Sequence, residues 1–212
     1  MNCIICRNPG SARFLTGDSK AYWSCNFCDG KYLDAAHYIY LDEEKERYLE
    51  HNNQINDVAY RSFLDKLAIP LKEHLSPSDT GLDFGCGHGP ALVDMLKKDG
   101  FDVSLYDPFF FPDKEVLLKT YNFITCTETA EHFHNPFEEF DKLDSLLKPG
   151  GWLGIMTCFL TTDAAFESWY YRRDPTHVTF YCEKTFEVIA SQRNWYYEIA
   201  SKDIVLLQKP HE

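Results

Sequence analysis

The stretch Leu82-Asp83-Phe84-Gly85-Cys86-Gly87-His88-Gly89 decides the expected fold of this chain. It predicts a short strand over 82–84 and a turn at alternating glycines. A helix is expected to follow over 90–98, because Pro90 suits a first helical turn. Glycine lets the backbone turn sharply and lets a ligand approach closely, and open parallel sheets bind ligands outside the carboxyl ends of their strands. We therefore expect a ligand at this loop, although the same glycines could form only a tight turn.

Strands and helices alternate along the chain from residue 80 onward. The apolar pattern predicts further strands over 103–106, 122–126, 152–158, 195–199 and 204–208, and helices over 137–147 and 183–193. This alternation predicts an α/β fold with a mostly parallel sheet flanked by helices, and the closing pair of strands predicts an antiparallel edge. The run Lys-Pro-Gly-Gly at 148–151 is expected to form the turn that ends the preceding helix.

The chain divides into three expected parts: a small module over 1–34, a helical cap over 35–79, and the main domain over 80–212. Within the cap, residues 41–75 have helical spacing. Asn52-Asn53 is expected to break that helical run, and Pro70 to end one helix or open the next. A chain of 212 residues with 44% hydrophobic residues can form one medium-sized domain with a small appendage.

An acidic residue ends the second expected strand. Asp107 lies 24 residues after Asp83, and a carboxylate at this place in an α/β fold can accept hydrogen bonds from ribose hydroxyls. The alternative is that Asp107, followed by Pro108, only starts a turn.

Four of the eight cysteines form two tight pairs near the start of the chain: Cys3, Cys6, Cys25 and Cys28. Two Cys-x-x-Cys turns brought together make a tetrahedral four-thiolate site that suits zinc, and such a closed site is structural. A segment of about 30 residues cannot be stabilised by burial alone, so a metal would also explain its folding. The alternative is two pairs of ordinary reduced cysteines.

The formal net charge of −12 weighs against a nucleic-acid partner, because polyanions prefer basic surfaces. No apolar run approaches the roughly 20 residues needed to cross a bilayer. The first residues show no basic region followed by an apolar stretch, so we expect no signal peptide and a cytoplasmic protein. The oligomeric state is not predicted.

From about residue 80 to 208 the chain resembles the class I, Rossmann-like S-adenosylmethionine-dependent methyltransferases. The pattern Asp83-x-Gly85-x-Gly87-x-Gly89 matches the family's first motif, and Asp107 matches its ribose-binding acid. Residues 125–132 resemble the segment after the fourth strand, and residues 146–151 resemble the turn before the fifth. The N-terminal cysteine pairs resemble a zinc ribbon. The resemblance implies that S-adenosylmethionine is held by Asp83, Gly85, Cys86, Gly87, Gly89, Asp107, Pro108, Thr127 and Glu128.

The chain departs from the family's pattern after Asp107. Only 13 residues separate Asp107 from Tyr121, where the family normally places a helix and a third strand. We therefore expect the third strand to be missing or vestigial, which leaves the adenine contact unassigned. The aromatic run 109–111 could pack on the base or belong to the core.

Substrate-binding residues are expected in the long segment 159–182, because long loops in compact domains are often functional. The candidates are Trp169, Tyr170, Arg172, Arg173 and Tyr181. The arginines could bind a carboxylate or phosphate, or form a solvated pair. His132 and His177 are the candidate catalytic residues, since an imidazole titrates near neutrality; each could instead be structural. Asn52, Asn53 and Tyr60 could cap the cofactor or simply belong to helix packing.

Three functions follow from these features. The leading hypothesis is a methyltransferase acting on an oxygen, nitrogen or carbon atom of a small molecule. The second is an RNA or protein methyltransferase that docks its target through the zinc ribbon. The third is a non-catalytic protein that binds the cofactor or a partner.

Overall fold

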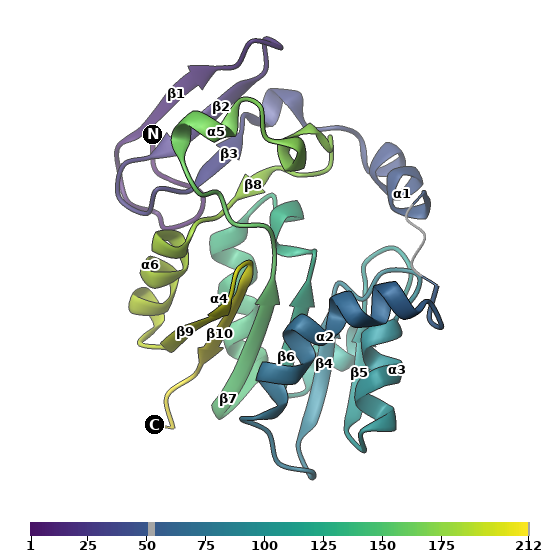
Figure 1. Cartoon of the computed structure of the whole chain (residues 1–212). Helices are drawn as coiled ribbons and strands as arrows, with labels where there is room; N and C mark the ends of the chain where they lie inside the picture. Colours follow the sequence, from purple (N-terminus) through teal and green to yellow (C-terminus); the bar gives the residue numbers. More distant parts are fainter. Residues whose placement is uncertain (51–53, 212) are drawn as a thin grey trace.

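The computed structural model of the chain describes residues 1–50 and 54–211, and its centre is a six-stranded sheet (Figure 1). The strand order is β5 (Asp102–Tyr106), β4 (Thr80–Phe84), β6 (Tyr121–Thr127), β7 (Leu147–Met156), β10 (Ile204–Gln208) and β9 (Tyr196–Ser201). The first four strands are parallel, and β10 runs antiparallel to both β7 and β9. The α/β fold with an antiparallel edge is therefore confirmed.

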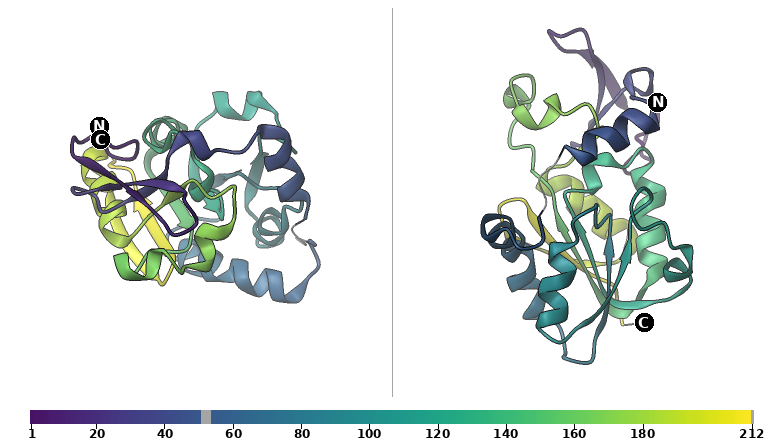
Figure 2. Two further views of the ribbon diagram at one scale, coloured as in Figure 1. Left: turned by 90° about the horizontal axis from the view of Figure 1, so that it is seen from above. Right: turned by 90° about the vertical axis from the view of Figure 1, so that its right-hand side faces the viewer.

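Helices cover both faces of this sheet (Figure 2). The helices on one face are α2 (Val58–Lys72) and α3 (Ala91–Lys98), and those on the other are α4 (Pro136–Leu146) and α6 (Glu183–Arg193). Side chains alternate between the two faces along β10: Ile204 and Leu206 pack with α2 and α3, whereas Val205 and Leu207 pack with α4 and α6. A strand buried on both sides is a continuous apolar run, as this one is.

The strand order places β4 between β5 and β6, which follow it in sequence on opposite sides. A crevice forms outside the carboxyl ends of the strands at such a switch point. Among the described residues, no strand pairs with the outer edge of β5. The chain between β5 and β6 forms a bridge between Asp107 and Phe111 and the short helix η2 (Lys114–Leu118). The predicted loss of a third strand is confirmed, because a parallel crossover needs a dozen or more residues in addition to the strand.

A second, antiparallel sheet lies above the carboxyl ends of the central strands (Figure 1). It consists of β1 (Ser11–Leu15), β2 (Ala21–Cys25), β3 (Lys31–Leu33) and β8 (Thr179–Phe180). The short helices η1 (Ala35–His37), α5 (Asp163–Phe166) and η4 (Tyr170–Arg173) surround it, and α1 (Leu41–Leu49) follows. Because β8 belongs to the C-terminal part of the chain, the N-terminal module shares its sheet with the main domain.

Two local predictions are wrong. Pro70 neither ends nor opens a helix but lies inside α2, two residues before its end, where its missing N–H removes only one late helical hydrogen bond. Residues 148–151 are not a separate turn, because they belong to the first half of β7. There they form an irregularity between the pairs Tyr121–Leu147 and Phe123–Trp152. Asn52-Asn53 lies outside the described residues.

Within residues 1–50 and 54–211, none of the helices combines the length and the apolar character that crossing a membrane requires.

Candidate active site

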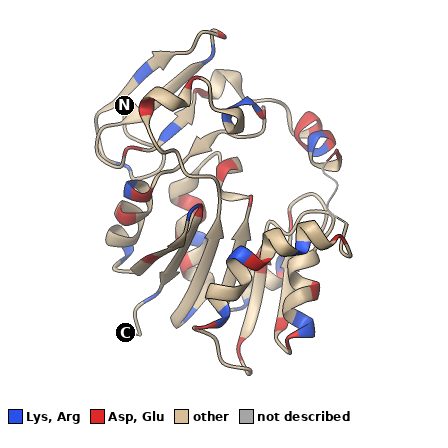
Figure 3. Ribbon diagram, viewed as in Figure 1, with Lys and Arg blue, Asp and Glu red and all other residues tan. Residues whose placement is uncertain are grey.

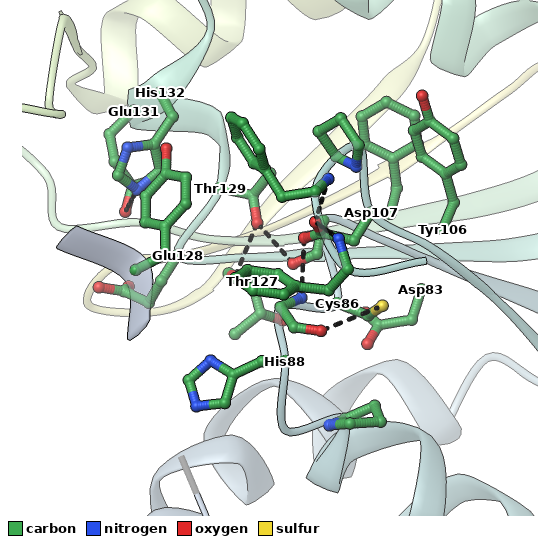
Figure 4. A pocket seen from close by; sticks show the side chains of 18 of the residues that line it. Asp83, Cys86, His88, Tyr106, Asp107, Thr127, Glu128, Thr129, Glu131 and His132 are labelled. Carbon is green, nitrogen blue, oxygen red and sulfur yellow. Dashed lines mark hydrogen bonds and ion pairs between the residues drawn. The ribbon is translucent and has the colours of Figure 1, made fainter. Parts of the chain in front are cut away.

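A cavity of about 700 Å³ opens at the carboxyl ends of β4, β5 and β6 (Figure 4). Its floor is the loop 85–89 together with residues 107–110 and 127–129. Helices α1 and α2 contribute Tyr48 and Tyr60 to its walls. A volume of this size suits a ligand of cofactor dimensions.

The glycine loop keeps the floor of the cavity open. Gly85 and Gly87 have φ angles of +80° and +62°, which favour glycine. A Cβ atom on Gly85 would lie 2.2 Å from the Thr129 Cγ2 atom, whereas a Cβ on Gly87 would meet no atom within 4 Å. Gly85 is therefore required by packing, and Gly87 leaves room for a ligand.

Asp107 organises the loops around it. Its Oδ2 accepts the Gly87 amide at 3.0 Å, and its Oδ1 accepts the amides of Phe109 and Phe110 at 2.8 and 3.0 Å. Asp107 therefore also starts a turn, as the alternative interpretation of the sequence predicted. A carboxylate offers about four acceptor sites, so one remains for a hydroxyl of a ligand.

Asp83 lies beneath the glycine loop, with a buried side chain. Burial raises the pKa of the Asp83 carboxyl to about 6, and the negative charge of Asp107 adds to this increase. A hydrogen bond of 2.6 Å from the Thr125 hydroxyl acts in the opposite direction and lowers the pKa. Burial also raises the pKa of the nearby Cys86 thiol.

The lining of the cavity is strongly acidic. Lys142 is the one lysine or arginine among the described lining residues. The acidic residues among them are Glu44, Asp83, Asp107, Glu128, Glu131, Glu139 and Asp174. Figure 4 shows Asp83 and Asp107 on one side and Glu131 with His132 on the other. Such a cavity favours a ligand that carries positive charge.

Glu128 and the adjacent turn form the far wall. Glu128 has φ +47°, a left-handed conformation that a side chain rarely adopts. Partial desolvation at the cavity wall, together with the charge of Glu131, raises the pKa of Glu128 above its ordinary value, although the residue itself is exposed. Non-glycine residues held in this region of φ often mark functional sites.

The two predicted catalytic residues, His132 and His177, lie beside Glu131 in this wall. The Nε2 atoms of His132 and His177 lie 3.9 and 4.0 Å from the Glu131 Oε1 atom. Burial lowers the pKa of His177, against the charge of Glu131, which raises it. The structure therefore brings both predicted histidines to the cavity, together with a buried glutamate that the sequence analysis did not select.

Residues 49–198 match the family model described as "Methyltransferase domain", which covers 150 of the 212 residues. The chain belongs to this methyltransferase family. A search among curated proteins gave no match.

Solved structures of methyltransferases share the fold of this methyltransferase. Human N-acetylserotonin methyltransferase, solved with S-adenosylmethionine, is 11% identical with a TM-score of 0.54, over 80% of this chain and 56% of that one. An O-methyltransferase family protein from Burkholderia thailandensis is 16% identical with a TM-score of 0.51, over 81% and 70%. A possible histamine N-methyltransferase from Thermotoga maritima is 15% identical with a TM-score of 0.50, over 81% and 96%.

The predicted cofactor-binding residues of the methyltransferase all lie at the cavity. They are Asp83, Gly85, Cys86, Gly87, Gly89, Asp107, Pro108, Thr127 and Glu128. Tyr60 lies there too. Their roles toward a cofactor stay predictions.

The five predicted substrate-binding residues do not line this cavity, and their role toward a substrate stays a prediction. None of Trp169, Tyr170, Arg172, Arg173 and Tyr181 is among the described residues that line the cavity. Tyr181 is fully buried, and its hydroxyl donates to the Ala130 carbonyl at 2.8 Å. Within segment 159–182, Phe166, Tyr171 and Phe180 pack with Tyr22 and Leu33 at the small sheet.

Arg172 is buried, so the alternative of a solvated residue is wrong for it. It is 5% exposed, and it donates to the carbonyls of Phe166 and Glu167 and to the Asp18 carboxylate. Arg173 donates to the Ser168 carbonyl. The contact with Asp18 joins η4 to the N-terminal module.

The four predicted zinc ligands converge. The Sγ atoms of Cys3 and Cys28 are 3.9 Å apart and those of Cys6 and Cys25 are 3.7 Å apart, and all four side chains are buried. Tetrahedral zinc with bonds of about 2.3 Å would set its sulfur atoms about 3.8 Å apart. The residues present therefore fit a four-thiolate zinc ion.

The two cysteine pairs adopt the same turn. The Arg7 amide donates to the Cys3 carbonyl at 2.9 Å, and the Asp29 amide donates to the Cys25 carbonyl at 3.0 Å. Arg7 and Asp29 have φ angles of 60° and 57°. An amide two residues after the first cysteine of each pair also donates to its sulfur, at 3.3 and 3.4 Å. Amides donated to sulfur stabilise a thiolate, the form that binds metal.

Glu44, Tyr48 and Glu131 are among the cavity residues that sequence reasoning missed. Glu131 precedes His132 directly, so the pair of adjacent titratable residues was a usable signal. Tyr48 carries no such signal, because only tertiary packing places α1 beside Phe109 and His132, with ring centroids 5.6 and 5.1 Å away.

Proposed function

We propose that the chain transfers a methyl group from S-adenosylmethionine to a small-molecule acceptor. The observation that carries this proposal is the acidic cavity, in which an open glycine loop faces the carboxylate of Asp107. S-adenosylmethionine carries a sulfonium and an ammonium group, so an acidic lining complements it. When bound, it supplies an electrophilic methyl group.

The residues of the loop would hold the cofactor in one orientation. Gly87 would leave space for its methionine portion, and the remaining acceptor site of Asp107 would receive a ribose hydroxyl. Phe109 and Phe110 line the cavity next to Asp107. Because the third strand is missing, we assign the adenine contact to these two rings. Alignment of donor and acceptor then supplies much of the rate.

The acceptor is assigned to the wall formed by Glu128, Glu131, His132 and His177. Tyr48 of α1 packs against His132 there, which encloses the position beside the cofactor site. An enclosed, acidic position favours a small molecule over a polyanion, in line with the net charge of −12. Figure 3 shows Lys and Arg scattered over the elements and interspersed with Asp and Glu in this view.

The N-terminal cysteines are assigned a structural zinc ion. Four thiolates leave no open coordination position, so the ion would stabilise the module and take no part in methyl transfer. The support is the sulfur spacing and the repeated turn described above.

Calorimetry tests the cofactor assignment. We expect the wild-type chain to bind S-adenosylmethionine and its demethylated product, and Asp107→Ala and Gly87→Asp to abolish binding. The first removes an acceptor and the second fills the cavity. Asp102→Ala, at the exposed amino end of the same strand β5, is the matched control and should bind normally. Absence of binding by the wild-type chain would refute the proposal.

A further inference from the structure

Three side chains with metal-binding atoms converge in the acceptor wall. Glu131, His132 and His177 each offer one atom, and these atoms lie within 4.8 Å of one another. Glu131 is fully buried, and the two imidazoles are 13% and 10% exposed. All three line the cavity, so an ion between them would face the ligand space.

The backbone sets the protonation of both imidazoles. The Nδ1 atom of His132 lies 3.0 Å from the Thr176 carbonyl, and that of His177 lies 2.7 Å from the Tyr171 carbonyl. A carbonyl oxygen only accepts, so each Nδ1 carries the hydrogen. In the neutral ring the lone pair is then on Nε2, and both Nε2 atoms are directed to Glu131. Metal-binding histidines are held by this kind of contact from their other nitrogen.

Glu131 is positioned in the same way. Its Oε2 accepts from the Thr157 hydroxyl at 2.9 Å, and its Oε1 accepts from the Tyr171 hydroxyl. Among the described ion pairs, its partners within 4.0 Å are the two imidazoles. At 3.9 and 4.0 Å these contacts are too long for hydrogen bonds. Buried carboxylates are normally paired with a cation or coordinate a metal.

We propose that Glu131, His132 and His177 bind a divalent transition-metal ion that holds a hydroxyl oxygen of the methyl acceptor. Two imidazole nitrogens and one carboxylate suit Zn²⁺, Mn²⁺, Fe²⁺ or Co²⁺ better than Mg²⁺, which prefers oxygen ligands. Three protein ligands leave coordination positions open, unlike the closed four-cysteine site. The two histidines are then metal ligands and not general bases.

The acceptor part of this proposal rests on the proposed methyl transfer. A metal ion lowers the pKa of a bound hydroxyl, so the hydroxyl releases its proton to solvent near neutral pH. The oxygen then forms a bond to the methyl carbon while the bond from that carbon to sulfur breaks. The sulfonium becomes a neutral thioether, and one proton is released for each methyl group transferred.

Metal binding is tested on the full chain carrying one equivalent of Zn²⁺, held by the four cysteines, by titration with Mn²⁺, with the free Mn²⁺ followed by electron paramagnetic resonance. We expect one saturable Mn²⁺ site, because thiolates do not favour this ion. His132→Gln and His177→Gln should each weaken it at least about tenfold. His88→Gln changes a histidine of the same cavity outside the cluster, and should leave Mn²⁺ binding unchanged. Thermal unfolding and zinc content confirm that each variant is folded.

Water-proton relaxation with bound Mn²⁺ tests the open positions, with water as the oxygen probe. Enhanced relaxation is expected, because water occupies positions that an acceptor hydroxyl would take. A wild-type chain with no saturable Mn²⁺ site, or variants that bind as the wild type does, would overturn the metal site. Absence of relaxation enhancement would overturn the acceptor role. These results are separate from calorimetry with S-adenosylmethionine, which alone decides the proposed function.

Discussion

At the scale of single residues, three of the carboxyl groups at the cavity, those of Asp83, Asp107 and Glu131, are buried. Asp83 supports the glycine loop from below while its own carboxyl is buried beside Thr125. Burial of a charge costs free energy, and Asp83 meets this cost through a raised pKa.

Substitution Asp83→Asn should stabilise the fold at neutral pH. The folded state raises the pKa of Asp83 to about 6 from its ordinary 3.8. The protonated Asp83 carboxyl therefore adds to the free energy of unfolding fully below about pH 4, and this addition is lost as the pH rises through 6. Asn keeps an acceptor for the Thr125 hydroxyl and has no charge to bury. We expect the variant to gain up to about 3 kcal/mol over the wild type at pH 7 relative to pH 4.

Urea unfolding of both proteins at the two pH values measures this difference. Asp102→Asn, on an exposed residue of β5, is the control and should show no pH-dependent gain. An equal stability difference between Asp83→Asn and wild type at both pH values would contradict the buried-charge interpretation.

At the scale of elements, strand β8 connects the small sheet to the active-site wall. The Leu33 amide donates to the Val178 carbonyl at 2.8 Å, and the Val178 amide donates to the Glu131 carbonyl at 2.9 Å. The Thr179 hydroxyl donates to the Phe133 carbonyl at 2.8 Å. Val178, the residue directly before β8, thus joins β3 to the turn that carries Glu131, with His177 next to it in sequence.

Thr179→Val removes the hydroxyl bond of this connection without changing side-chain shape much. Because the Phe133 carbonyl loses a buried donor, we expect a loss of about 1–3 kcal/mol in the free energy of unfolding. Denaturant unfolding measures it, with Thr120→Val on an exposed threonine as the control. A stability equal to that of the control variant would show that the bond contributes nothing.

At the scale of the whole molecule, the cysteine site is attached to the methyltransferase domain at several points. The Cys28 carbonyl accepts from the Thr185 hydroxyl at 2.9 Å, and the Cys6 carbonyl accepts from the Gln192 side chain at 2.7 Å, both from α6. The cysteines also share one apolar cluster with residues of the central sheet. The four-cysteine module is therefore part of the domain's packing, and its unfolding should affect the active site through β8.

Removal of the proposed zinc ion should loosen this connection. After chelation, or in Cys25→Ser, we expect faster hydrogen exchange at the amides of Leu33 and Val178, because their acceptors belong to elements that the module holds in place. The amides of β10 are the internal control and should stay protected, since they pair within the central sheet. If chelation left the hydrogen-exchange rate of the Val178 amide unchanged, the predicted coupling between the module and the active site would be wrong.

Local features of the sequence determined much of this protein. The glycine loop, the acid that ends β5, the paired cysteines and the missing third strand were all predicted, because each depends on neighbours within a few residues or on a simple chain length. The alternation of strands and helices likewise follows from side-chain periodicity. These features could be predicted because nearby residues in the sequence determine them.

Only the tertiary structure decided which distant residues share a site. His177 reaches Glu131 because β8 joins the small sheet, and Tyr48 reaches His132 because α1 folds back over the cavity. Arg172 was assigned to the substrate, but its side chain contacts Asp18 and Tyr22, which are far away along the chain. Burial depends on such long-range contacts, which no local pattern encodes.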